Sequence, residues 1–145
     1  MIPKAPANEN ELTRLLKRGE GISLEFKRST GELREGMQTI CAFLNGSGGM
    51  LLFGVRSDGV AEGQQVSDKT IREVTQAYER FEPPVNVPVE RLPLKAGREI
   101  LVLRSDGSSD SIPFTYEGRP YERVGSTSRK MSQEKIGRAS CRERV

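Results

Sequence analysis

The chain has 145 residues, of which 34% are hydrophobic, so it is long enough to bury one core and we expect a single domain. It carries 23 basic and 20 acidic residues and no histidine, which excludes a Ser-His-Asp triad, a histidine general base and a histidine-ligated zinc ion. No apolar stretch approaches the roughly 20 residues that a membrane-spanning helix needs, and the N-terminal residues lack the apolar segment of a secretory signal. We therefore expect a cytoplasmic protein with no membrane contact.

The last ten residues, 136–145, match the translation of a common sequencing-adapter oligonucleotide, so we expect them to be read-through rather than part of the domain. Without them the chain has 20 basic and 19 acidic residues, and its formal net charge falls from +3 to +1. We assign residues 1–135 to one domain and expect a further domain of the parent chain to follow it. Cys41 is then the single cysteine, and its place on an apolar helix face predicts a buried, reduced thiol.

The N-terminal part of the chain predicts a short helix and a strand. Asn10 is a candidate cap for the helix, in which leucines recur at helical spacing, and Gly19 is its candidate end. Residues 22–27 then alternate apolar and polar side chains, which is typical of a strand. This alternation predicts that Glu25 and Lys27 share an exposed face of the sheet.

The next segment predicts a helix that leads directly into a buried strand. Residues 32–44 have apolar side chains at intervals of three and four, the pattern of a helix packed on a sheet. The wholly apolar run 50–55 predicts a central strand buried on both faces. Between them lies an expected exposed glycine loop, formed by Asn45, Gly46, Ser47, Gly48 and Gly49.

The second half of the chain predicts one helix followed by strands. Ser67 or Asp68 is a candidate cap for a helix that ends near residue 81. Strands are predicted at residues 85–89 and 99–103 and in a hairpin, 114–116 and 119–124, around Glu117-Gly118. We therefore predict an α+β fold, in which a mixed sheet carries helices 32–44 and 68–81 on one side.

The glycine run also invites interpretation as a phosphate-binding loop. Standard phosphate loops, however, run from a strand through glycines into a helix, so that the helix N-terminus faces the anion. Here the helix comes first, and the partial negative charge at its C-terminus repels a phosphate. We therefore favour a left-handed helix stop at this run and find only weak support for ATP binding.

Three acidic residues, Glu20, Glu25 and Asp58, are candidate catalytic residues and candidate ligands of a divalent metal ion. Such an ion needs two or three oxygen ligands held together. Glu20 lies at the entrance of the first predicted strand, Glu25 on its face and Asp58 beyond the end of a neighbouring strand, so strand pairing can bring the carboxylates together. The competing interpretation, which we favour, is that Glu25 pairs with a nearby cation and that Asp58 is a turn residue.

Basic residues follow the predicted strands and continue through the hairpin; they are Lys27, Arg28, Arg56, Arg119, Arg123, Arg129 and Lys130. Arginine and lysine neutralise phosphates with little sequence preference, and Tyr116 and Tyr121 are candidate platforms for stacked bases. The first three cations are also the candidate partners of Glu25. A net charge of +1 does not by itself indicate a nucleic-acid-binding surface, so nucleic-acid binding requires these cations to cluster in space.

Three segments together resemble one known family. They are Leu24-Glu25-Phe26-Lys27, the run 40–55 and Tyr121-Glu122-Arg123-Val124-Gly125-Ser126-Thr127. In this order and at these separations they resemble the Schlafen AlbA-type domain, also known as a divergent ATPase-associated or DNA-binding domain. The resemblance covers roughly residues 11–135.

The resemblance implies a nucleic-acid-binding module, because most bacterial relatives look like DNA-binding or transcriptional-regulator modules placed ahead of other domains. The residues that we expect to contact the nucleic acid are Lys27, Arg28, Arg56, Arg119, Tyr121 and Arg123. The glycine loop, Asn45, Gly46, Gly48 and Gly49, would let the backbone approach closely. For this function we expect no cofactor; the partner is DNA or RNA, and a homo-oligomer is possible.

The resemblance also implies an alternative, because some eukaryotic Schlafen members look like metal-dependent RNases that use three acids. Two of those glutamates stand five residues apart, as Glu20 and Glu25 do. The usual place of the third acid is held by Arg56, so Asp58 is the substitute. Magnesium or manganese would be the metal of such an endoribonuclease. An ATP-binding or ATPase-linked module is a further alternative.

Overall fold

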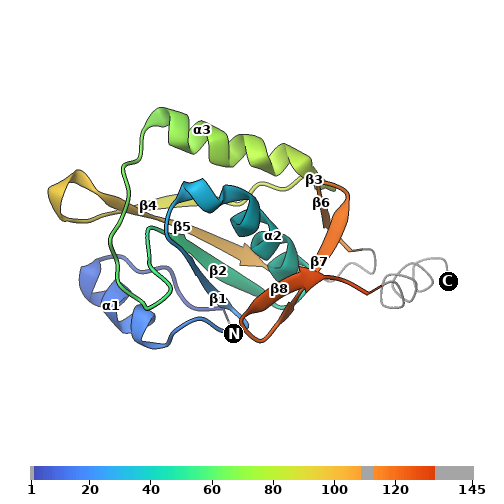
Figure 1. The fold of residues 1–145 in the computed structure, drawn as a ribbon, viewed down its shortest axis with the longest axis horizontal. Coiled ribbons are helices and arrows are strands. Elements are labelled where there is room, and N and C mark those ends of the chain that lie inside the picture. Colours follow the sequence, from blue (N-terminus) through green and yellow to red (C-terminus); the bar gives the residue numbers. More distant parts are fainter. Residues whose placement is uncertain (1, 109–112, 133–145) are drawn as a thin grey trace.

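A four-stranded mixed sheet forms the centre of the computed structural model, which describes residues 2–108 and 113–132 (Figure 1). Its strands, in spatial order, are β1 (Leu24–Lys27), β2 (Gly48–Phe53), β5 (Glu99–Asp106) and β4 (Val89–Pro93). β1 and β2 are parallel, whereas β5 is antiparallel to both β2 and β4. The predicted α+β fold with a mixed sheet is confirmed; the domain boundary at residue 135 and the read-through at 136–145 lie outside the described residues.

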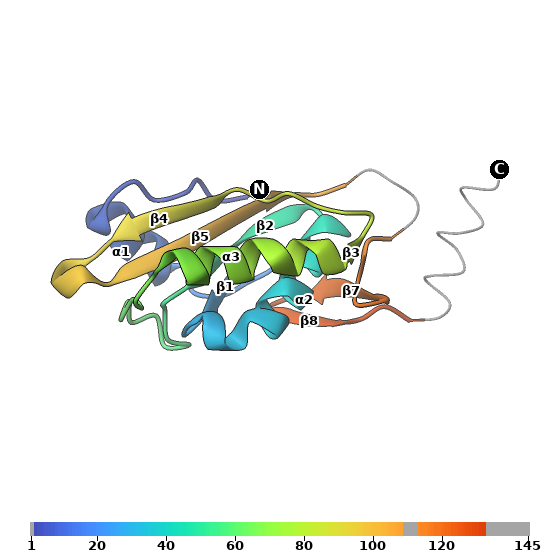
Figure 2. The same ribbon diagram turned by 90° about the horizontal axis from the view of Figure 1, so that it is seen from above.

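The two faces of this sheet are covered by different helices. α2 (Leu33–Leu44) and α3 (Asp68–Ala77) pack on one face, and α1 (Glu9–Lys17) packs on the other (Figure 2). Side chains alternate along β2, so Leu51 and Phe53 belong to the α2 side of the core while Met50 and Leu52 belong to the α1 side. β2 is buried throughout, as its apolar run predicts, and α2 and α3 share one side of the sheet, as predicted.

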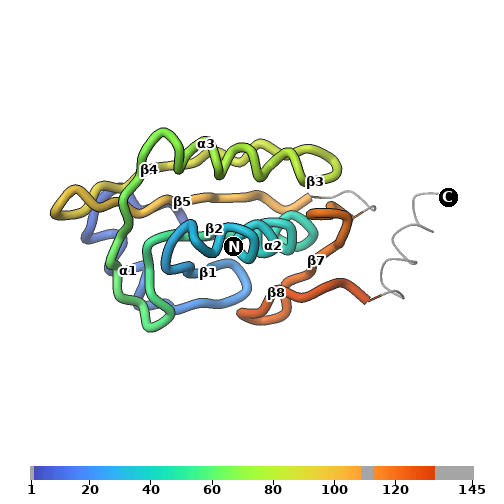
Figure 3. Tube along the Cα trace, turned by 45° about the horizontal axis from the view of Figure 1, so that its top comes forward, coloured from blue at the N-terminus to red at the C-terminus, as the bar shows by residue number. Residues whose placement is uncertain are grey.

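A second, smaller sheet has the order β3 (Phe81–Glu82), β6 (Thr115–Tyr116), β7 (Arg119–Val124) and β8 (Thr127–Lys130). β6 and β7 form the predicted hairpin around Glu117-Gly118, and both turn residues have positive φ. β7 and β8 lie against α2 (Figure 3). Short 3-10 helices complete the fold: η1 (Thr30–Glu32), η2 (Tyr78–Arg80) and η3 (Lys95–Gly97).

The prediction that Glu25 and Lys27 share an exposed face of the sheet is wrong. The register of β1 and β2 pairs Glu25 with Leu51 and Lys27 with Phe53, so these side chains lie on the face that α2 covers. β7 and β8 close over the same face, and Glu25 is only 8% exposed. The alternation correctly separated the polar and apolar faces of β1. The polar face is nevertheless buried, because the β7–β8 hairpin, about 100 residues further along the chain, packs on it.

Helix ends also differ from the prediction in detail. The cap of α1 is Asn8 rather than Asn10, because the Asn8 side chain accepts a hydrogen bond from the Glu11 amide at 2.9 Å. The cap of α3 is Ser67, one of the two predicted candidates, whose hydroxyl accepts from the Thr70 amide. Cys41 is buried with a free thiol, as predicted, and burial raises the pKa of that thiol to about 11.

The predicted exposed glycine loop is only half present. Gly46 and Ser47 are exposed, but Gly48 and Gly49 are buried because they begin β2. A Cβ atom on Gly49 would lie 2.5 Å from the Phe43 ring, so this glycine allows α2 to pack close to the strand. The left-handed helix stop predicted at this glycine run is also wrong: α2 ends in right-handed geometry at Asn45, and the first positive φ of the run, at Gly48, already belongs to β2.

Gly36 in α2 provides a test of how tightly this helix packs on the sheet. A Cβ atom there would lie 2.6 Å from the end of the Phe53 ring, which is fully buried. We expect Gly36→Ala to lower the free energy of unfolding by about 1–2 kcal/mol, because overpacking costs about 1–3 kcal/mol and the gain in helix propensity is smaller. Urea denaturation measures the change.

The matched control is Gly21→Ala, since a Cβ atom on Gly21 meets nothing within 4 Å and its φ is not positive. We expect this variant to be neutral or slightly more stable than the parent. Equal stability of the two alanine variants would contradict the close approach of α2 to β2.

Candidate nucleic-acid interface

A cleft of about 430 Å³ lies beside β1, at the ends of the two parallel strands β1 and β2. It is lined by Glu20, Glu25, Phe26, Lys27, Arg28, Glu32, Arg56, Ser57 and Asp58. Parallel strands bring their C-terminal ends to the same edge of a sheet, which places the residues after β1 beside those after β2. Three cations and three acids that the sequence singled out therefore line one cavity.

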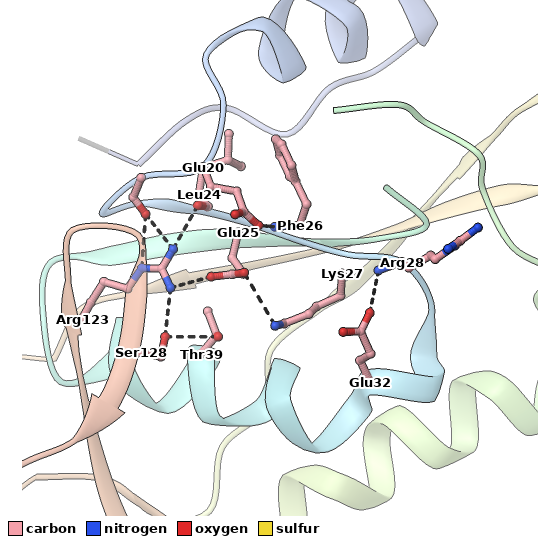
Figure 4. A network of polar contacts seen from close by, with 11 residues as sticks. Glu20, Leu24, Glu25, Phe26, Lys27, Arg28, Glu32, Thr39, Arg123 and Ser128 are labelled. Carbon is pink, nitrogen blue, oxygen red and sulfur yellow. Dashed lines mark hydrogen bonds and ion pairs between the residues drawn. The ribbon is translucent and has the colours of Figure 1, made fainter. Parts of the chain in front are cut away.

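Glu20 and Glu25 lie together, with Glu25 the more deeply buried of the two (Figure 4). Glu20 Oε1 accepts a hydrogen bond from the Phe26 amide at 2.9 Å. Burial raises the pKa of Glu20, and the hydrogen bond and charge of Glu25 raise it further, whereas the Phe26 amide and Lys27 act in the opposite direction. Glu20 thus retains its proton to higher pH than an ordinary glutamate.

Arg123 of β7 reaches across to β1 and fixes Glu25. Its Nη1 donates to Glu25 Oε1 at 2.6 Å, while Nε and Nη2 donate to the Gly21 carbonyl at 3.2 and 2.7 Å (Figure 4). Nη2 also donates to the Leu24 carbonyl, and Nη1 to Ser128 Oγ at 2.9 Å. All five N–H groups of the guanidinium therefore have acceptors within the protein.

The surroundings of Arg123 enclose it further. Its guanidinium lies 5.2 Å from the centre of the Phe43 ring, and Ser128 donates onward to Thr39 of α2. The Arg123 side chain is only 3% exposed. The sequence predicted a phosphate contact for Arg123, but in this fold the side chain instead ties the β7–β8 hairpin to β1, because it has neither exposed surface nor a spare donor.

The outer edge of β1 is occupied by side chains of the chain itself. Glu20 accepts from the Phe26 amide, Glu32 accepts from the Arg28 amide at 2.9 Å, and Arg123 donates to the Leu24 carbonyl. These groups face away from β2; the Leu24 carbonyl also accepts from the Gly21 amide at 2.9 Å, and the Phe26 and Arg28 amides would otherwise be open to an incoming strand. Glu32 was not among the sequence candidates, and no motif marked it.

The mouth of the cleft carries two exposed arginines. Arg28 is 70% exposed and Arg56 is 44% exposed. Both pair with Glu62, at 3.4 Å in each case, and Arg56 also pairs with Asp58. Lys27 lies deeper, with Nζ 3.6 Å from Glu25 Oε2. The cations of the cleft thus divide into an exposed pair at its mouth and one half-buried lysine that neutralises Glu25.

The three acids share the cleft but do not form a set of metal ligands. Asp58 pairs with Arg56, and the two oxygens of Glu25 face Arg123 and Lys27. Within residues 2–108 and 113–132, no three acidic or cysteine side chains come close enough to hold one metal ion. As arranged, the residues do not fit a divalent metal, because cations already occupy the positions around the carboxylates.

Other predicted contact residues lie elsewhere. The rings of Tyr116 and Tyr121 are buried, so neither offers a face to a base. The Asn45 amide bonds to the Phe114 backbone and the Tyr121 carbonyl, which ties the end of α2 to the second sheet. Arg119 is exposed, but it lines a different pocket together with Arg34 of α2.

Comparison with known proteins agrees with this fold. The family model of the Schlafen AlbA_2 domain matches residues 20–132, and the chain belongs to this family. No curated protein matches the chain. In the part of the chain that the structure describes, no helix has the length and apolar character needed to cross a membrane.

Two solved structures share the fold. One is the N-terminal domain of a Nitrosomonas europaea protein proposed to be an ATP-dependent DNA helicase related to RecG: the TM-score is 0.58 at 22% identity, covering 86% of this chain and 94% of that domain. The other is the DIP2311 protein of Corynebacterium diphtheriae, with a TM-score of 0.54 at 18% identity. The match covers 76% of this chain but only 22% of the Corynebacterium chain.

The enclosed Arg123–Glu25 pair predicts a large loss of stability when one partner is removed. We expect Arg123→Gln to lower the free energy of unfolding by about 3–5 kcal/mol, because it leaves a buried carboxylate without its main partner. Arg123→Lys should lose less, since it keeps the charge but not the five-donor geometry. Urea denaturation is the measurement, with exposed Arg119→Gln as the control, which should stay within about 0.5 kcal/mol of the parent. Equal stability of the two glutamine variants would rule out the role given to Arg123.

The raised pKa of Glu20 predicts that the difference in stability between the parent and Glu20→Gln depends on pH. In this variant the amide oxygen of the glutamine can still accept the hydrogen bond from the Phe26 amide. A carboxyl group with a raised pKa in the folded state binds more protons folded than unfolded, so its contribution to stability falls as pH rises above its ordinary value of 4.5. We therefore expect Glu20→Gln to gain stability relative to the parent between pH 4 and pH 7. Urea denaturation at several pH values measures the difference, and a relative loss over that interval would contradict it.

Proposed function

We propose that this chain is a nucleic-acid-binding module and that a sugar-phosphate strand lies across the mouth of the cleft beside β1. The observation that carries the proposal is the exposed pair Arg28 and Arg56, which come from two different loops to the same opening. Guanidinium groups suit phosphates because they donate two parallel hydrogen bonds. Lys27, deeper in the cleft, would contribute positive potential rather than a direct contact.

The ion pairs of these arginines do not prevent phosphate binding. Arg28 and Arg56 share Glu62, and both lie at the protein surface. Exposed ion pairs contribute only about 0–1 kcal/mol each, so a phosphate can take the place of a carboxylate at small cost. Release of counterions from the nucleic acid then favours binding and makes the affinity depend on salt.

The family and one relative support the same class of function. The Nitrosomonas europaea domain of similar fold belongs to a protein proposed to be a DNA helicase, so DNA is the first partner to test. Within the parent protein we propose that the module serves as the DNA-binding part of a bacterial regulator of transcription. In this function the chain itself needs no cofactor.

Binding at the cleft predicts a salt-dependent affinity that falls when both arginines are replaced. We expect Arg28→Gln/Arg56→Gln to weaken binding and to reduce the slope of log affinity against log salt by about 2, because each lost phosphate contact removes about one unit. Fluorescence anisotropy with labelled single-stranded and duplex DNA and RNA, at several salt concentrations, measures both quantities.

The matched control is Arg14→Gln/Arg72→Gln, which removes two exposed arginines from α1 and α3. These residues do not line the cleft, so the control should bind like the parent. The proposal fails if binding is independent of salt or if both double variants lose the same affinity.

A metal-dependent endoribonuclease is a second candidate, and one observation favours it: Glu20, Glu25 and Asp58 line the same cleft. Their present ion pairs oppose metal binding, so this function would require the acids to exchange partners. We expect the chain to bind RNA without cutting it in magnesium or manganese, as gel analysis of labelled RNA would show. Metal-dependent cleavage that disappears in Glu20→Gln would instead establish the second candidate.

A further inference from the structure

A second group of cations surrounds the turn between β6 and β7, away from the cleft. Arg34 comes from α2, Arg80 from η2 and Arg119 from β7. Glu117, at the tip of the turn, pairs with Arg34 and Arg80. None of these residues lines the cleft beside β1.

The geometry leaves positive charge in excess. Arg34 donates two hydrogen bonds to Glu117, Nε to Oε1 at 3.0 Å and Nη2 to Oε2 at 3.1 Å. Arg80 Nη1 lies 3.8 Å from Glu117 Oε2. Arg119 is exposed and forms no ion pair with any of the residues that the structure describes. Two guanidinium groups therefore face the Glu117 carboxylate, with Arg119 beside them in the pocket, while Glu35 adds negative charge near Arg34.

Two of these arginines, Arg34 and Arg119, line a small pocket. It has a volume of about 250 Å³ and is lined by Arg34, Gln38, Glu117, Arg119 and Tyr121. Sites for organic ligands are commonly about 300–1,000 Å³, so this pocket suits a small anion rather than a cofactor. The Gln38 amide can add a neutral donor. Lys130, which is exposed, lies opposite Tyr121 in the β7–β8 register.

The two arginines that contact Glu117 are held in place yet remain accessible. The side chains of Arg34 and Arg80 are 66% and 60% exposed. Arg34 uses Nε and Nη2 for Glu117, so its remaining N–H groups are the ones open to a ligand. The cleft beside β1 is lined by four acids and three cations, whereas the pocket at the turn is lined by one acid and two arginines.

We propose that Arg34, Arg80 and Arg119 form a phosphate-binding site at the β6–β7 turn. The ligand is a phosphate group, either a phosphodiester of a nucleic-acid strand or a free or terminal phosphate. Arg119 and the outer N–H groups of Arg34 contact it, and Glu117 competes with it for the arginines. The nucleic-acid source rests on the proposed function, whereas binding of inorganic phosphate does not.

The test is a titration of the ¹⁵N-labelled chain with inorganic phosphate, followed by NMR at constant ionic strength. We expect amide shifts centred on residues 117–119 and on the first turns of α2. Arg34→Gln and Arg119→Gln should each weaken phosphate binding by about tenfold, the effect of losing one hydrogen bond to a charged group. Arg14→Gln on α1 is the matched control and should leave binding unchanged.

Glu117→Gln provides a change of opposite sign. It removes the competing carboxylate, so phosphate affinity should rise, an outcome that partial unfolding cannot produce. Shifts spread over the whole surface, or equal effects of Arg14→Gln and Arg34→Gln, would overturn the site. So would weaker phosphate binding by Glu117→Gln when its spectrum remains that of the folded parent.

A second titration, with an unphosphorylated single-stranded oligonucleotide, separates the two proposals. Shifts at the turn with both ligands support a phosphodiester contact. If inorganic phosphate shifts the turn and the oligonucleotide shifts no part of the chain, the site is one for free or terminal phosphate, and the result counts against the nucleic-acid function. Oligonucleotide binding that depends on Arg28 and Arg56, with no phosphate shifts at the turn, supports the function and refutes the second site.

Discussion

The salt link between Arg123 and Glu25 is the interaction on which the arrangement of both sheets depends. It joins residues 98 positions apart and is enclosed by β1, α2 and the β7–β8 hairpin. A buried pair of this kind stabilises a fold only when every donor and acceptor is satisfied, and the five bonds of the guanidinium meet that condition. The hairpin is thereby fixed over the end of α2, which in turn positions the β6–β7 turn and its arginines. The Arg123–Glu25 ion pair therefore helps to position both the cleft and the β6–β7 turn.

The order of elements and the faces of the central sheet could be predicted from the sequence, because they follow from local patterns. The apolar run of β2 and the three- and four-residue intervals of α2 each require only one segment to interpret. The same holds for the cleft: Glu20 lies at the entrance of β1, Glu25 within β1 and Asp58 beyond the end of β2, and parallel pairing of β1 with β2 brings them together. The ion pairs of these acids do not follow from strand pairing, since Asp58 pairs with Arg56, two residues away, instead of joining the other acids around a metal ion.

What the sequence could not predict is which polar residues become buried. Arg123 looks like a surface cation in a strand of alternating character, and Glu25 looks exposed on the same grounds. Both are buried because a distant hairpin packs on the polar face of β1, an event that no local pattern records. Arg119 was among the predicted contacts, but Arg34 and Arg80 were missed for the same reason, since only tertiary contacts bring them to the β6–β7 turn. The cations suited to phosphate are therefore those that the core does not use.

The side chains that cover the outer edge of β1 have a consequence for how the chain behaves in a crowded solution. Because Glu20, Glu32 and Arg123 already bond the peptide groups of Leu24, Phe26 and Arg28, a second copy finds few open positions from which to extend the sheet. Negative charge at two of these positions also repels the carbonyl oxygens of an approaching backbone. The edge next to the cleft is thereby protected against fibril-like stacking while the cleft stays open to a ligand of another kind.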